Sequence, residues 1–314
     1  MKKTILALAV PALLAAGAAN ASITLSDSDG VTVKLSGAAE VQFYKGYEAD
    51  KDATIRLDDG DLEVNAEVVI SEGLSAVANI AWKFEDSDLQ NDELNVGFAG
   101  DFGTVTFGRN CALGDDIGNA MDHELGKQVG GPVCTYDKLA KWTYDADTFY
   151  AAANYGFDSD DAKNSDGTTL VEAMVGVRFE IVDGRAYYSA VEKLDGSDID
   201  TIAVEADVAI TDQFDIALSY TNQETSDSTS GATTDDVNGY LIALGYQASE
   251  RAHFAVGYDL QDRDDKYGAE KYNVYLNTTY QVQSNVKAYA ELGQQDIKNG
   301  DSETGYVLGM EVKF

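Results

Sequence analysis

Hydrophobic and polar residues alternate along most of this chain, in segments separated by clusters of Asp, Gly and Ser. The C-terminus shows the pattern clearly, because one face of it would carry Tyr306, Leu308, Met310, Val312 and Phe314. The positions between them are mostly glycine or charged. A period of two predicts a β-strand with one apolar and one mostly polar face. Such a strand at the end of a chain needs a partner, and in lipid only a closed barrel leaves no unpaired edge.

The same alternation predicts sixteen strands along the chain. We place them at residues 31–45, 53–70, 74–84, 92–100, 103–110, 137–145, 148–157, 169–181, 185–194, 199–210, 214–223, 236–248, 252–262, 269–282, 286–295 and 304–314.

The connections between these strands alternate in length. Short turns are expected at 71–73, 101–102, 145–147, 182–184, 211–213, 249–251 and 283–285, and longer acidic loops such as 158–168 and 225–235 lie between them. This rhythm is typical of bacterial outer-membrane barrels. A β-sandwich would not require it and would show polar outer faces. The prediction is therefore an all-β fold, a 16-stranded antiparallel transmembrane β-barrel that is apolar outside.

Aromatic residues recur near the predicted strand ends, where we expect them to point outward. They suit the two membrane–water interfaces, at which an amphipathic ring meets the lipid headgroups. The set comprises Tyr44, Trp82, Phe84, Phe98, Trp142, Tyr155, Phe157, Tyr220, Tyr246 and Tyr280.

The N-terminus has the features of a secretory signal. Met1-Lys2-Lys3 is basic, Thr4 to Ala18 is almost entirely apolar or small, and Ala19-Asn20-Ala21 offers a small-x-small cleavage site. We predict a cleaved signal peptide at residues 1–21 and a barrel domain at 22–314. A membrane anchor is the alternative, but a membrane-spanning helix needs roughly 18 apolar residues and this run is shorter.

The chain is strongly acidic, with 55 Asp and Glu against 22 Lys and Arg and a formal net charge of −33. Such a chain repels nucleic acid, so we expect no nucleic-acid partner. Acidic groups in an exported protein can instead attract divalent cations or favour cation passage. The motif Asp27-x-Asp29-Gly30 begins like a calcium loop, but no Glu stands at its twelfth position. We expect no cofactor and no dedicated metal site, only weak Ca²⁺ binding by acidic loops.

Two cysteines follow the predicted cleavage site, Cys111 and Cys134. In an oxidising periplasm a single pair predicts one disulfide. Free thiols are an alternative, and a metal site is a weaker one because only His123 lies close in sequence.

One connection interrupts the strand pattern, since about 26 residues run from Cys111 to Asp137 without alternation. Loops this long in a compact domain are usually functional or disordered. The preceding hairpin, Phe98-Ala99-Gly100 followed by Gly103-x-x-x-Phe107-Gly108-Arg109-Asn110, resembles that of the Gram-negative general diffusion porins, and Gly130-Gly131 matches the glycine pair of their third loop. The resemblance extends to the chain's length, strand count and terminal Phe.

The resemblance implies an outer-membrane homotrimer through which ions and small hydrophilic solutes diffuse passively. It also implies that the third loop folds inward and narrows the pore. Loop acids would then line the constriction: Asp115, Asp116, Asp122 and Glu124. The first two are expected to cap a short helical turn that runs to Asp122. The alternative is a solvated surface loop.

The family usually places a basic cluster opposite that loop, but the matching positions here are Ala38, Asp61, Asn95 and Asp137. Strand parity assigns to the pore wall Lys34, Asp61, Glu63, Lys83, Asn95, Lys141 and Arg178. Arg109 falls on the outward face, and we interpret it as an interface or loop-anchoring residue. A mainly acidic lumen predicts a preference for cations.

Two other functions were weighed. A substrate-specific channel, for example for sugars, usually has eighteen strands and a run of aromatic residues, which this sequence lacks. A barrel enzyme needs a catalytic His, but only His123 and His253 are present and no G-x-S-x-G motif occurs. We therefore expect a channel and not an enzyme, with lipid, lipopolysaccharide, cations and small solutes as its partners.

Overall fold

The computed structural model describes residues 22–85, 89–117, 123–126, 129–157, 169–264, 266–298 and 300–314. The predicted signal peptide and Asp122 lie outside these ranges. Among the described residues, no helix is long and apolar enough to cross a membrane.

The described residues form eighteen strand segments and one short 3₁₀ helix, η1 (Leu113–Asp116). The strands are β1 (Ser22–Ser28), β2 (Val31–Lys45), β3 (Thr54–Asp59), β4 (Asp61–Ser71), β5 (Leu74–Lys83), β6 (Gln90–Gly100), β7 (Gly103–Cys111), β8 (Thr135–Asp145), β9 (Phe149–Gly156), β10 (Thr169–Phe179), β11 (Val182–Glu192), β12 (Ser197–Ala209), β13 (Phe214–Asp227), β14 (Thr233–Gln247), β15 (Ala252–Arg263), β16 (Lys271–Gln283), β17 (Val286–Ile297) and β18 (Ser302–Lys313).

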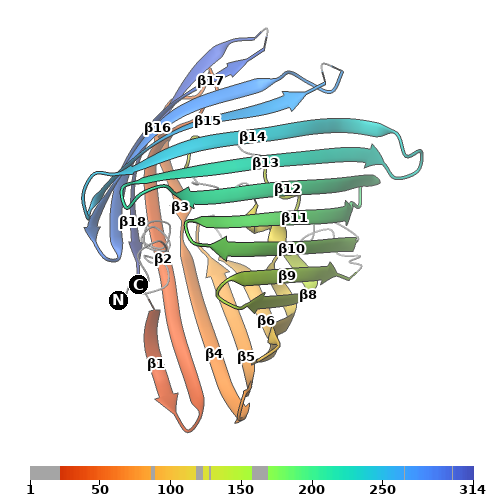
Figure 1. Cartoon of the computed structure of the whole chain (residues 1–314), viewed down its shortest axis with the longest axis vertical. Helices are drawn as coiled ribbons and strands as arrows, with labels where there is room; N and C mark the ends of the chain where they lie inside the picture. The colour runs from red at the N-terminus through yellow and green to blue at the C-terminus, as the bar shows by residue number, and fades with distance from the viewer. Residues whose placement is uncertain are drawn as a thin grey trace.

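These segments form one closed antiparallel barrel (Figure 1). Sequential strands pair with each other, and β18 returns to pair with β2, which closes the ring. β3 and β4 pair with different halves of β2 and together make one strand of the barrel. β1 and β18 likewise share one position beside β2, and Gly37 N donates to the Phe314 carbonyl at 2.8 Å where they meet. The barrel therefore has sixteen strands, which confirms the prediction.

The strand boundaries differ from the sequence prediction at three places. β1 was missed, because its sequence is short and mostly polar and it becomes a strand only by pairing with β2. The long second strand is interrupted at Gly60. The turn expected at 182–184 lies instead at Glu180–Ile181, where Glu180 adopts a positive φ of 49° and Phe179 pairs with Val182.

The two faces of the barrel differ in the predicted way. On β10, Val171, Val175 and Val177 are exposed, and Val175 leaves 53% of its surface accessible, whereas Glu172 between them is buried. A lipid-facing wall has this pattern, because hydrocarbon solvates apolar side chains. Tyr44 is an exception to the predicted outward aromatics. It lies on the polar face, where the Arg56 guanidinium stacks 3.9 Å from the centre of its ring.

Candidate functional site

The connection between β7 and β8, which we call the β7–β8 segment (residues 112–134), contacts the polar face of the barrel near its start and again near its middle. At the first end it meets Glu172 of β10, which is only 1% exposed. The Glu172 carboxylate accepts hydrogen bonds from Leu113 N at 2.7 Å and Gly114 N at 3.0 Å. Asn154 and Tyr187 of the neighbouring strands donate to the same carboxylate at 2.7 and 2.6 Å. These four donors stabilise the buried charge and fix the start of the segment.

Near its middle, at Glu124 and Leu125, the segment meets Glu291 of β17, which is 5% exposed. Its carboxylate accepts from Glu124 N at 3.1 Å, Leu125 N at 2.9 Å and Asn277 Nδ2 at 2.8 Å. The Leu125 carbonyl accepts from Asn273 Nδ2 at 2.6 Å. β10 and β17 are far apart in the strand order, so the segment is attached to two separate parts of the wall.

Apolar side chains reinforce each attachment. Leu125 is fully buried in a cluster with aromatic and aliphatic wall residues, Tyr47, Tyr275, Tyr289 and Val307. Leu113 and Ile117 pack in a second cluster with Ala152, Met174, Tyr187 and Ala203. Burying each of these aliphatic side chains is worth about 1.5–3 kcal/mol. The segment is therefore attached by small cores as well as by hydrogen bonds.

The acidic residues at the start of the segment do not cap a helix as expected. Asp115 and Asp116 lie inside η1, which begins after Ala112 without a side-chain cap. The helix starts earlier because the Glu172 carboxylate, from another strand, takes the N–H groups that a capping residue would accept. Asp115 and Asp116 are left exposed. Both side chains are therefore accessible to mobile ions.

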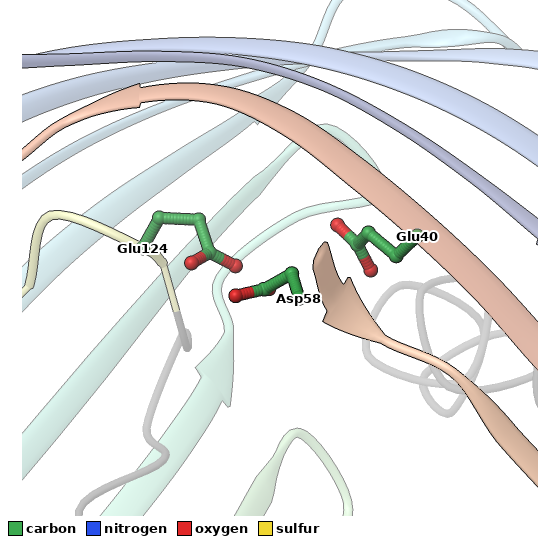
Figure 2. Close-up of side chains that lie close together, drawn as sticks. All are labelled: Glu40, Asp58 and Glu124. Atoms are coloured by element: carbon green, nitrogen blue, oxygen red, sulfur yellow. The ribbon is translucent and has the colours of Figure 1, made fainter. Parts of the chain in front are cut away.

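Glu124, at the contact with Glu291, belongs to a cluster of carboxylates. Figure 2 shows Glu40 from β2 and Asp58 from β3 pointing toward Glu124. Arg56 Nη2 lies 2.5 Å from Glu124 Oε2 and 2.6 Å from Asp58 Oδ1. Glu40 accepts a hydrogen bond from the Tyr289 hydroxyl. The cation held by this cluster is therefore the arginine of the chain itself.

The sequence pattern did not predict that Arg56 faces the lumen, because the alternation of apolar and polar residues shifts within its strand. Ile55 and Leu57 are exposed on the outer face, whereas Leu62 and Val64 continue that face at even positions. Asp58 is an extra residue between Leu57 and Asp59 in the pairing with β2, and it shifts the alternation by one residue. Parity read backward from Leu62 would place Arg56 outside, whereas parity read from its own neighbours places it inside.

Three predicted wall residues line one cavity of about 350 Å³: Lys34, Asn95 and Lys141. Lys141 Nζ donates to the Cys111 carbonyl at 2.9 Å, at the base of the β7–β8 segment. Glu63, on the same wall, accepts from Ser36 Oγ at 3.2 Å.

The other predicted wall residues are engaged in local charge interactions. Lys83 Nζ lies 3.1 Å from Asp92 Oδ1. Asp61 lies beside Asp59 and Glu85, with carboxylate oxygens within 4.8 Å of one another. Arg178 binds Asp145 at 2.8 Å and Asp183 at 3.2 Å, close to the short-turn rim. The cationic charges of Lys83 and Arg178 are therefore balanced by neighbouring acids.

Arg109 connects three neighbouring strands. Its Nη1 donates to the backbone carbonyl of Asn91 at 2.9 Å and to the Asn91 side chain at 2.7 Å. Its Nε donates to Asp137 of β8. This geometry ties β6, β7 and β8 together where the β7–β8 segment begins and ends.

The predicted disulfide between Cys111 and Cys134 is wrong. Cys111 pairs with Thr135 across β7 and β8, and Ala112 N donates to the Cys134 carbonyl at 2.7 Å. The two cysteines are thus offset by one residue in the ladder. Cys134 lies just before β8, and no disulfide joins the two residues.

His123 lies beside the second attachment. Its Nδ1 is 3.8 Å from Glu291 Oε1, and its side chain is 10% exposed. Burial, which disfavours the charged imidazolium, lowers the pKa of His123 to about 4. The ring is therefore neutral at pH 7.

Comparison with known proteins agrees with this architecture. The family model described as Gram-negative porin matches residues 7–300. This chain belongs to the Gram-negative porin family. The porin is 40% identical to porin-like protein H of Photobacterium profundum over 100% of both chains. It is 29% identical to outer membrane protein U of Vibrio vulnificus over 55% of this chain and 53% of that protein.

Solved outer-membrane proteins share the fold of this porin. OmpT of Vibrio cholerae superimposes with a TM-score of 0.79 at 21% identity, over 93% of this chain and 99% of that one. An anion-selective porin from Comamonas acidovorans gives 0.77 at 14% identity, over 90% and 100%. The porin is thus an outer-membrane channel for passive diffusion.

Proposed function

We propose that this porin passes ions and small hydrophilic solutes through a constriction formed by the β7–β8 segment, and that it prefers cations. The observation that carries the proposal is the pair of attachments at Glu172 and Glu291. Both glutamates project from the face opposite the exposed apolar band, which is the face that lines the lumen of a lipid-embedded barrel. A segment bound to that face on β10 and on β17 has to cross the lumen, where it narrows the path of a solute.

The charges near the segment support the cation preference. Asp115 and Asp116 are exposed, and two arginines of the lumen are paired with acids: Arg56 with Asp58 and Glu124, and Arg185 with Glu205 at 2.5 Å. Because a low-dielectric wall focuses the field of exposed carboxylates, cations are enriched in the pore. Salt screens this field over about 10 Å at 0.1 M, so the preference should grow at low ionic strength.

The porin from Comamonas acidovorans shares the fold but is described as anion-selective, whereas we propose a preference for cations here. Selectivity is therefore expected to follow from the charged side chains of each pore and not from the barrel.

A charge-neutralising pair of variants tests the proposal. Asp115→Asn with Asp116→Asn should move the reversal potential in a KCl gradient toward zero. The matched control neutralises Asp227 and Asp235, at the facing ends of β13 and β14, and should move it less. Equal shifts from both pairs would show that the β7–β8 segment does not control ion selectivity.

Export and assembly complete the proposal. Residues 1–21 would be removed as a signal peptide, and three copies would associate in the outer membrane beside lipopolysaccharide. The acidic loops would bind Ca²⁺ weakly, without a resident cofactor. N-terminal sequencing of the mature protein should begin at Ser22, and a retained Met1 would contradict the cleavage.

A further inference from the structure

A row of carboxamides crosses one part of the barrel wall. Asn65 of β4 lies directly opposite Asn79 of β5, and Asn79 lies directly opposite Asn95 of β6. Lys34 of β2 extends the row, since it is opposite Asn65. Directly opposed residues of an antiparallel ladder share a face and stand about 4.5–5.5 Å apart. The three amides therefore form a regular row on the wall, which we call the amide row (Asn65, Asn79 and Asn95).

The amide row faces the cavity of about 350 Å³ described above. Four threonines, from β2, β7 and β8, complete the polar lining: Thr32, Thr104, Thr106 and Thr143. Thr104 lies next to the short turn before β7, and Lys141 in the same lining reaches the Cys111 carbonyl at 2.9 Å. The cavity thus lies between the short-turn rim and the β7–β8 segment. A solute crossing the channel would have to pass it.

The hydrogen-bonding capacity of the amide row is only partly used. Asn79 Nδ2 donates to Glu63 and, at 3.2 Å, to Asn65 Oδ1. The Asn79 carbonyl oxygen is buried and has no hydrogen-bond partner among the described residues. Asn95 Nδ2 makes two long bonds of 3.3 Å. An unpaired buried acceptor is costly, so turning the Asn79 amide toward a donor that enters the cavity is favoured.

Two of the charges in this lining already have roles. Glu93 Oε1 accepts from Cys111 N at 3.0 Å, and Lys141 donates to the carbonyl of the same residue. Both side chains are therefore engaged by the backbone at the end of β7. Lys34 and Glu67 also line the cavity, and the neutral amides and hydroxyls beside them present donors and acceptors together.

We propose that this cavity is a transient binding subsite for an uncharged, polyhydroxylated solute of mono- to disaccharide size. A sugar hydroxyl both donates and accepts, so neighbouring hydroxyls can meet the alternating donors and acceptors of the amide row and the threonines. The volume is at the lower end of the range for small-molecule pockets, which suits brief residence better than tight binding. The inference rests on the proposed open lumen, but it does not depend on the proposed cation preference.

Current blockade in planar bilayers tests the subsite. Sucrose is added to the wild-type trimer and to the Asn79→Leu variant. This substitution removes the carbonyl oxygen and the NH₂ of the amide but keeps the branched shape of the side chain. Thr279→Val, on the polar face of β16 outside the cavity lining, is the matched control. We expect sucrose to interrupt the wild-type and Thr279→Val currents, and its apparent affinity to fall about fivefold in Asn79→Leu, the effect of one hydrogen bond. Asn95→Leu should weaken sucrose similarly and provides a second variant if Asn79→Leu fails to fold.

Other outcomes overturn the subsite. These are no sucrose blockade in the wild type, equal blockade in Asn79→Leu and Thr279→Val, or stronger blockade by the zwitterion glycine betaine than by sucrose. Reversal potentials measured on the same channels report the ion preference separately. Loss of the cation preference with retained sucrose blockade would contradict the proposed selectivity and leave the subsite supported.

Discussion

The attachment at Glu291 can be weakened without removing any volume. In Glu291→Gln one oxygen remains an acceptor, but the other becomes an NH₂ group. The carboxylate accepts from Glu124 N, Leu125 N and Asn277 Nδ2, at 3.1, 2.9 and 2.8 Å. Replacing one acceptor by a donor therefore breaks at least one of these bonds and places two donors against each other.

The size of the effect follows from the charge of the acceptor. A hydrogen bond to a charged group is worth about 1.5–3 kcal/mol, and a buried donor left without an acceptor costs about 1–3 kcal/mol more. We expect the attachment to weaken by about 2.5–6 kcal/mol in total. A weakening of about 2.5 kcal/mol corresponds to a roughly 70-fold change in the ratio of attached to detached segment. The barrel itself should stay folded, because its stability comes from the closed strand ladder.

Single-channel recordings and liposome swelling measure this change. The Glu291→Gln channel should show greater open-channel current noise and admit larger uncharged solutes than the wild type. Glu311→Gln is the control, because Glu311 is equally buried, at 4% exposure, and binds Lys287 and Lys313 of the barrel wall. Glu311→Gln removes one negative charge, as Glu291→Gln does, but it leaves intact the carboxylate that accepts hydrogen bonds from the segment.

Three results would refute this reasoning. If both variants raised current noise equally, the effect would come from lumen charge and not from attachment of the segment. If Glu291→Gln lost its detergent-resistant, heat-modifiable form, Glu291 would be a determinant of barrel folding. Wild-type behaviour of both variants would likewise refute an attachment at Glu291.

Three further predictions concern the thiols, pH and assembly. Alkylation of the denatured, unreduced protein should label both Cys111 and Cys134, and dithiothreitol should leave conductance unchanged. A disulfide found by mass spectrometry would contradict the unbridged cysteines of the structure. The pKa of His123 is about 4 when buried, below the usual 6.5, so a detached segment binds more protons as the pH falls from about 6.5 to 4 and attachment weakens in that window. Current noise should therefore rise on acidification more in the wild type than in His123→Asn, and equal rises would exclude His123 as the cause. The native protein should migrate as a heat-modifiable trimer in mild detergent, whereas a monomeric mass would contradict the proposed assembly.

The barrel could be predicted well from sequence because a lipid-facing strand imposes a local rule. Every second residue has to be apolar, and this period of two identifies strands such as β2 at its observed bounds, Val31–Lys45. The rule fails where pairing partners decide the structure. β1 is mostly polar and is a strand only because β2 extends beyond the end of β18.

The candidate site was harder to predict because it depends on contacts between distant residues. The role of Glu172 in holding Leu113 and Gly114 becomes visible only when the segment is in place. Arg56 was hidden by the shift of parity at Asp58. The cysteine error has a similar origin, since the number of cysteines suggested a bridge that the fold does not form.

The reversal potential of the wild-type protein in a planar bilayer tests the central claim most directly. With a tenfold KCl gradient, the account predicts stable ohmic channels with a reversal potential of the sign expected for K⁺ permeation. Its magnitude should increase when both solutions are diluted, because weaker screening strengthens the field of the exposed Asp115 and Asp116 carboxylates. A reversal potential on the Cl⁻ side, or one that does not change with dilution, would contradict the claim that acidic residues of the β7–β8 segment control passage.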